Sequence, residues 1–112
     1  MNDPKSTSTE KAYVVPFFET ARKAKIVHAT YMLGQLYETG TEVPTDEKLA
    51  FSYYTEGAAL NEKNSVFRLA YFYETGKAVE KDAREAIRLY QKADELGLPG
   101  AKMKVKMLER ML

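Results

Sequence analysis

Cysteine and tryptophan are missing from this 112-residue sequence, and histidine occurs once, as His28. Without cysteine there is no disulfide framework and no thiolate that could act as a nucleophile or a metal ligand. A lone histidine leaves a metal site without the several converging ligands that it ordinarily needs. The sequence also lacks a glycine-rich phosphate loop and a Gly-x-Ser-x-Gly nucleophile motif. We therefore expect no enzyme, no metal and no cofactor.

Long apolar runs are absent as well. No stretch approaches the ~18–20 apolar residues that a membrane-spanning helix needs, and the start, Met-Asn-Asp-Pro-Lys, lacks the basic region of a signal peptide. The net charge of +1, from 17 basic and 16 acidic residues, gives no general attraction to nucleic acid or membrane. We expect a cytoplasmic protein with no nucleic-acid partner and no membrane insertion.

A repeated tetrapeptide is the main positive feature. Tyr-Glu-Thr-Gly begins at Tyr37 and again at Tyr73, 36 residues later, and this interval indicates a repeat protein. The same offset aligns residues of similar size and polarity: Ala29, Ser65 and Ala101; Tyr31, Phe67 and Met103; Leu33, Leu69 and Val105; Leu36, Phe72 and Leu108; Asp46 and Asp82; Tyr54 and Tyr90.

Each unit is predicted to contain two helices. The first runs from about Ala29 to Thr39, because Ala29, Leu33, Leu36 and Tyr37 share one face of a 3.6-residue period. Gly40 is expected to close this helix in a left-handed conformation, and Gly76 its counterpart.

The second helix of each unit carries start and stop signals. Asp46 and Asp82 suit N-caps, and Asp82 with Glu85 three residues later resembles a capping box. Asn61 and Gly97 are expected just past the ends of these helices, because both residue types tolerate a left-handed backbone.

Together these residues resemble the Sel-one-like repeat family, a relative of the tetratricopeptide repeat. The resemblance covers about residues 28–108 and departs mildly at Asn61, Ala70 and Asp94. It implies an all-α fold, a short right-handed α-solenoid of antiparallel helix pairs that serves as a protein-interaction scaffold. The matching positions are Ala29, Leu33-Gly34, Tyr37, Gly40, Val43, Asp46, Ala50, Tyr53-Tyr54 and Ala58-Ala59, then Ser65, Leu69, Tyr73, Gly76, Val79, Asp82, Ala86, Leu89-Tyr90, Ala93 and Gly97.

The chain divides into five predicted segments. Residues 1–9 are polar and are expected to form a disordered tail. Phe18 and Ala21 lie 36 residues before Tyr54 and Gly57, so residues 10–27 are expected to form a partial N-terminal repeat, with Pro16 tolerated in the first turn of its helix. Residues 28–63 are repeat one, 64–99 repeat two and 100–112 a C-terminal helix.

A candidate binding strip lies opposite the core stripe of the first helices, on the expected concave face. Aromatic and methionine side chains facing outward are what a peptide or partner helix would use. Packing of Tyr31, Phe67 and Met103 against adjacent helices is the alternative. The predicted strip comprises His28, Tyr31, Gln35, Glu38, Asn64, Phe67, Tyr71, Glu74, Met103, Met107 and Arg110.

Two glutamates, three lysines and a methionine stripe are also considered. Glu38 and Glu74 are expected to be solvated, with a carboxylate pair as the alternative. Lys102, Lys104 and Lys106 are expected to be ordinary solvated charges. Residues 101–112 also carry a methionine stripe (Met103, Met107 and Met111), which either completes the end of the stack or docks on another molecule.

The sequence therefore favours a non-enzymatic scaffold or adaptor that binds a peptide or helix of another protein on its concave face. The second hypothesis is an assembly module that forms a homodimer through residues 101–112. An RNA-binding helical repeat of the pentatricopeptide kind is a third, disfavoured by the placement of glycine and tyrosine and by the near-neutral charge.

Overall fold

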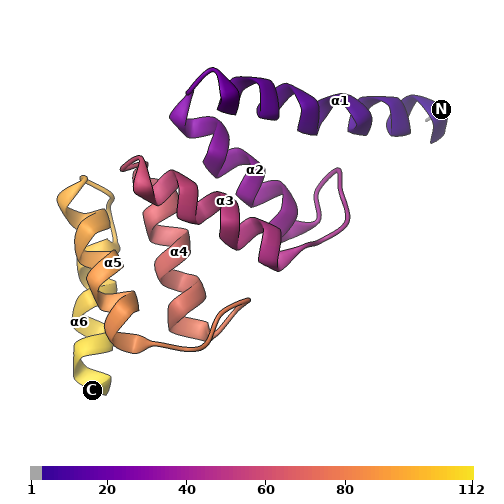
Figure 1. The fold of residues 1–112 in the computed structure, drawn as a ribbon. Coiled ribbons are helices and arrows are strands. Elements are labelled where there is room, and N and C mark those ends of the chain that lie inside the picture. The colour runs from indigo at the N-terminus through magenta and orange to yellow at the C-terminus, as the bar shows by residue number, and fades with distance from the viewer. Residues whose placement is uncertain (1–3) are drawn as a thin grey trace.

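A computed structural model describes residues 4–112, and its side chains from residue 14 onward. The described residues form helices with no strand, which confirms the predicted all-α repeat fold. The helices follow one another in chain order from α1 at one end to α6 at the other, with extents of 51 × 26 × 24 Å (Figure 1). They are α1 (Pro4–Lys23), α2 (Val27–Thr39), α3 (Glu47–Ala59), α4 (Lys63–Thr75), α5 (Ala83–Glu95) and α6 (Ala101–Met111).

The 36-residue period is visible in the turns that follow α1, α3 and α5. Lys25, Asn61 and Gly97 have φ values of 65°, 60° and 91°, the left-handed conformation expected at Asn61 and Gly97. After each of them an N–H bonds to the carbonyl five residues earlier: Ile26 to Ala21 (3.0 Å), Glu62 to Gly57 (2.9 Å) and Leu98 to Ala93 (3.0 Å). Helix α1 therefore ends as the second helix of each repeat does.

The start of α1 differs from the expected disordered tail. Residues 4–9 form the first turns of α1, while residues 1–3 lie outside the described residues. Once a helix exists, each added residue contributes a hydrogen bond without a new nucleation cost, so a polar segment extends it readily. Pro4 costs little there, because an N–H in the first turn has no partner within the helix.

The helix ends confirm the predicted caps, with one exception. Asp46 accepts a hydrogen bond from the N–H of Leu49, and Asp82 from that of Glu85, both at 3.1 Å. The capping box at Asp82 and Glu85 is wrong in its reciprocal half. The Asp82 N–H donates instead to the carbonyl of Tyr73 at 2.9 Å, and the Glu85 carboxylate binds Arg88. The last turns of α4 thus satisfy the donor that the box would have used.

Two glycines of the first repeat permit close helix crossings, one within the repeat and one with the next repeat. A Cβ on Gly34 of α2 would lie 2.6 Å from the ring of Tyr54 in α3, and a Cβ on Gly57 of α3 would lie 2.2 Å from Ser65 Oγ in α4. Tyr54 is fully buried between these helices. Its equivalent Tyr90 is likewise fully buried in the second repeat, so the two tyrosines anchor the core.

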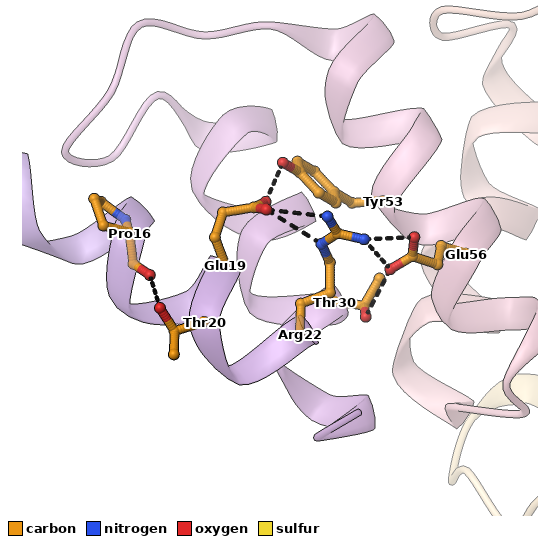
Figure 2. A network of polar contacts seen from close by, with 7 residues as sticks. All are labelled: Pro16, Glu19, Thr20, Arg22, Thr30, Tyr53 and Glu56. Atoms are coloured by element: carbon orange, nitrogen blue, oxygen red, sulfur yellow. Dashed lines mark hydrogen bonds and ion pairs between the residues drawn. The ribbon is translucent and has the colours of Figure 1, made fainter. Parts of the chain in front are cut away.

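Helix α1 is tied to α3 by a polar network, which Figure 2 shows with the Arg22 guanidinium lying between two carboxylates. Arg22 Nη2 lies 3.0 Å from Glu19 Oε2, and Nη1 lies 2.9 Å from Glu56 Oε1 of α3. Tyr53 donates its hydroxyl hydrogen to Glu19, and Thr30 donates to Glu56. Burial opposes the charge on Glu19, but the Tyr53 and Arg22 hydrogen bonds outweigh it and lower the pKa of that carboxyl.

Candidate functional site

Residues of the predicted strip converge on a cleft between α2 and α4. Tyr31, Gln35 and Glu38 were predicted to share a face, and they line this cleft together. Its volume is about 250 Å³, and we call it the α2–α4 cleft. The remaining lining residues are Thr39, Tyr54 and Arg68.

Glu38 is the hub of polar contacts in the cleft. Its side chain is only 6% exposed, which corrects the expectation that it is solvated. Tyr54 donates its hydroxyl hydrogen to Glu38 Oε1 at 2.8 Å, Arg68 binds both carboxylate oxygens, and Lys77 Nζ lies 3.3 Å from Oε2. Burial alone would raise the pKa of Glu38. The hydrogen bonds from Arg68 and Tyr54 outweigh burial and lower that pKa.

The second repeat contains the same arrangement 36 residues later. Tyr90 donates its hydroxyl hydrogen to Glu74 Oε1 at 2.7 Å, and Lys104 Nζ lies 3.3 Å from the same oxygen. Glu74 is 23% exposed, so it too is engaged and not simply solvated. Lys104 is a structural partner as well, contrary to the expectation of an ordinary solvated charge. Each glutamate thus joins the second helix of its own repeat to the next first helix.

The two tyrosines are fixed as hydrogen-bond donors. Burial is the largest influence on Tyr54 and Tyr90 and raises their pKa, and the hydrogen bonds to Glu38 and Glu74 raise it further. Both phenols therefore stay protonated around neutral pH. A phenol that stays protonated donates a hydrogen bond to the neighbouring carboxylate and cannot act as a general base.

Three aromatic residues of the strip are half-buried, so part of each ring packs on the core. The Phe67 ring meets Tyr90 edge-on at 5.0 Å between centroids, and the Tyr31 ring lies 6.1 Å from that of Tyr54. The Arg68 guanidinium covers the ring of Tyr71 at 4.6 Å. The packing alternative thus describes part of Tyr31 and Phe67, while all three residues remain partly exposed.

Comparison with known proteins identifies the repeat. The family model of the Sel1 repeat matches residues 27–62 and again residues 64–98. The chain belongs to the Sel1 repeat family. Sel1 repeats generally mediate protein–protein interaction. None of the curated proteins matches the sequence.

Several solved Sel1-type structures are similar to this chain. Cysteine-rich protein B of Helicobacter pylori is 28% identical, with a TM-score of 0.76 over 81% of this chain and 68% of that one. A Sel1 repeat protein from Oxalobacter formigenes is 30% identical, with a TM-score of 0.78 over 82% and 69%. The protective antigen c5321 of uropathogenic Escherichia coli is 27% identical, with a TM-score of 0.73 over 77% of this chain and 18% of that one.

Helix α6 extends the strip beyond the two Sel1 repeats with exposed residues. Met103 is 67% exposed and Met107 52% exposed, and Arg110 is also exposed. Met103 is the repeat equivalent of Tyr31 and Phe67, each of which packs on a tyrosine of a second helix. No second helix follows α6 in residues 4–112. Its thioether is therefore left uncovered.

The remaining predicted residues lie at helix starts. His28 is exposed on the first turn of α2, near the ring of Tyr31. Asn64 belongs to the start of α4, where Glu62 accepts from the N–H groups of Asn64 (2.9 Å) and Ser65 (3.1 Å). Glutamate is not a preferred N-cap, so this role of Glu62 was not predicted.

Sequence reasoning missed the cations of this site. Arg68 and Lys77 both bind Glu38, and neither was in the predicted strip. One signal was present: Arg68 and Lys104 are 36 residues apart, and both are basic. Tyr54 and Tyr90 are also 36 residues apart. A basic residue and a tyrosine that both recur at the repeat interval indicate a contact that occurs in each repeat.

In the described part of the chain, no group of three or more histidine, aspartate or glutamate side chains could hold a metal ion. No helix there is long and apolar enough to cross a membrane.

Proposed function

We propose that this chain is a non-enzymatic scaffold or adaptor that binds a peptide segment or helix of another protein along the concave face of its first helices. The observation that carries the proposal is that the α2–α4 cleft and the exposed methionines of α6 occupy equivalent repeat positions. Gln35 of the cleft aligns with Tyr71 of α4 and with Met107 of α6. A bound segment would therefore meet all three first helices in succession.

The side chains along this strip suit protein recognition. Met103 and Met107 are flexible and polarisable, so they adapt to different apolar partners. The half-buried rings of Tyr31 and Tyr71 are held by the core and lose little conformational freedom when a partner binds. Gln35 and Arg110, both exposed, supply polar groups at the rim.

The test begins with peptides selected on the purified chain from a random displayed library. Their affinity is then measured by fluorescence anisotropy against the wild-type chain and a Met103→Ala/Met107→Ala variant. These two positions are preferable to Phe67, because Phe67 packs on Tyr90 and its loss would disturb the fold. We expect a loss of about 1–3 kcal/mol for each hot-spot residue.

The control is Lys102→Ala, an exposed position of α6 outside the strip. It should leave affinity unchanged. Circular dichroism establishes that each variant is folded. An unchanged affinity in the folded Met103→Ala/Met107→Ala variant would count against this face.

Self-association through α6 is the second candidate, supported by the exposure of Met103, Met107, Met111 and Leu112. Continuation of the array is disfavoured by Lys106, which stands two repeats after Gly34, where the missing side chain allows a second helix to approach closely. Sedimentation over a wide concentration range decides between the candidates. A dimer that Met107→Lys/Met111→Lys abolishes would support assembly, and a monomer at all concentrations would contradict it.

A further inference from the structure

Arg68 retains hydrogen-bonding capacity toward the α2–α4 cleft. Its bonds to Glu38 use Nε and Nη2. Nη1 donates to none of the residues whose side chains the structure describes, and no buried nitrogen or oxygen there lacks a partner, so Nη1 is open to solvent. Arg68 lines the cleft opposite Tyr31 and Gln35. A guanidinium with a free edge is a strong donor to a carboxylate.

The charges around the cleft are layered. Glu38 lies beneath its cations, since it is 6% exposed while Arg68 and Lys77 are 31% and 27% exposed. Lys104 covers Glu74 in the same way, at 31% against 23%. Arg110 occupies the equivalent position on α6, where a cation replaces the glutamate. A partner therefore meets cations first, although the chain as a whole is nearly neutral.

We infer that the partner segment is acidic as well as apolar, and that the α2–α4 cleft takes one of its carboxylate side chains. The carboxylate accepts from Arg68 Nη1, between Tyr31 and Gln35. Apolar side chains of the same segment lie on Met103 and Met107, and further acidic groups meet Lys104 and Arg110. The inference rests on the proposed function and adds the chemistry of the partner to it.

The same cations would attract a nucleic acid, but the rings of this face argue against it. Single-stranded nucleic acids bind by stacking bases on free aromatic faces. Arg68 covers the ring of Tyr71, and the Phe67 ring meets Tyr90 edge-on. The outer part of the strip consists of methionines, which suit aliphatic side chains of a protein.

The experiment scores the composition of the peptides selected from the random displayed library. We expect aspartate and glutamate to be enriched over lysine and arginine, together with leucine, isoleucine and phenylalanine. The affinity of a selected peptide should fall as salt is added, because exposed charge pairs are screened. A copy of that peptide with its acidic residues replaced by the corresponding amides should bind about 10-fold more weakly.

Variants locate the carboxylate. Arg68→Gln alone would leave Glu38 buried with one cation fewer, so the informative variant is Glu38→Gln/Arg68→Gln, which removes both charges. We expect it to weaken the acidic peptide about 10-fold and to leave the amide copy unaffected. Arg84→Gln, which removes an exposed arginine of α5 outside the strip, is the matched control and should leave the affinity for the acidic peptide unchanged.

The remaining outcomes of the selection would contradict the inference, the proposed function or both. Selected peptides that are neutral or basic, and that still depend on Met103 and Met107, would overturn this inference and leave the proposed function standing. Acidic peptides indifferent to Glu38→Gln/Arg68→Gln would overturn the assignment to the cleft. No retained peptide would count against both proposals. Retention of single-stranded RNA at low salt, with no peptide bound, would favour the nucleic-acid alternative.

Discussion

The hydroxyl of Tyr54 donates a hydrogen bond to Glu38 across 2.8 Å, and through this bond the second helix of one repeat supports a carboxylate that the next repeat also binds. Arg68 of α4 holds the other side of Glu38. The bond therefore belongs to the interface between repeats, which is the main source of stability in a solenoid.

Removal of this hydroxyl should destabilise the chain. We expect Tyr54→Phe to lower the free energy of unfolding by about 1.5–3 kcal/mol, the range for hydrogen bonds to charged groups. Tyr90→Phe is a matched control, because it removes the same atom from an equally buried ring. Its loss should be smaller, since the more exposed Glu74 can recruit water. Urea denaturation measures both; equal losses, or none for Tyr54→Phe, would contradict the asymmetry.

Stability should fall in acid partly through Glu38. Its folded pKa is lowered, because the Arg68 and Tyr54 hydrogen bonds outweigh burial. A lowered pKa gives stability that is complete above the unfolded value of about 4.3 and is lost as pH falls through the folded value. The free energy of unfolding should therefore decline below about pH 5. Glu38→Gln should flatten the decline, whereas Glu80→Gln, at an exposed position, should not.

The close contact between α3 and α4 should make Gly57→Ala destabilising. Helix propensity favours alanine by about 1 kcal/mol, but a Cβ at Gly57 would lie 2.2 Å from Ser65 Oγ and 2.6 Å from Ser65 Cβ. We expect net destabilisation of about 1–3 kcal/mol from overpacking. Ser52→Ala, at an exposed site of the same helix, should be neutral or stabilising. Thermal denaturation compares them, and a Gly57→Ala chain more stable than wild type would show that the crossing relaxes freely.

Loss of Arg22 should release α1 without unfolding the repeats. Arg22→Met removes the cation between Glu19 and Glu56 and leaves these carboxylates facing each other. Hydrogen exchange of residues 14–23, followed by mass spectrometry, should accelerate while α4 and α5 keep their protection. Lys23→Met, at an exposed neighbouring position, is the control. Unchanged exchange in α1 would mean that apolar packing alone holds this helix.

The sequence predicted those features that depend on local rules. Gly40 and Gly76 have φ values of 72° and 75° because a left-handed residue closes a helix, and Asp46 caps α3 because its carboxylate reaches a free N–H. Such roles need only neighbouring residues. Glu38 was misjudged for the opposite reason, because three of its partners lie 16, 30 and 39 residues away along the chain.

The sequence by itself determined the helices, their order and the family. Apolar stripes and caps depend on residues a few positions apart, and the 36-residue period can be counted along the chain. Only the tertiary structure decided that Tyr54 donates a hydrogen bond to Glu38, and which residues of the strip remain exposed. Burial depends on which helix covers which face. The rings of Tyr31 and Phe67 pack on tyrosines of second helices, whereas no second helix follows α6 within residues 4–112 and Met103 is 67% exposed.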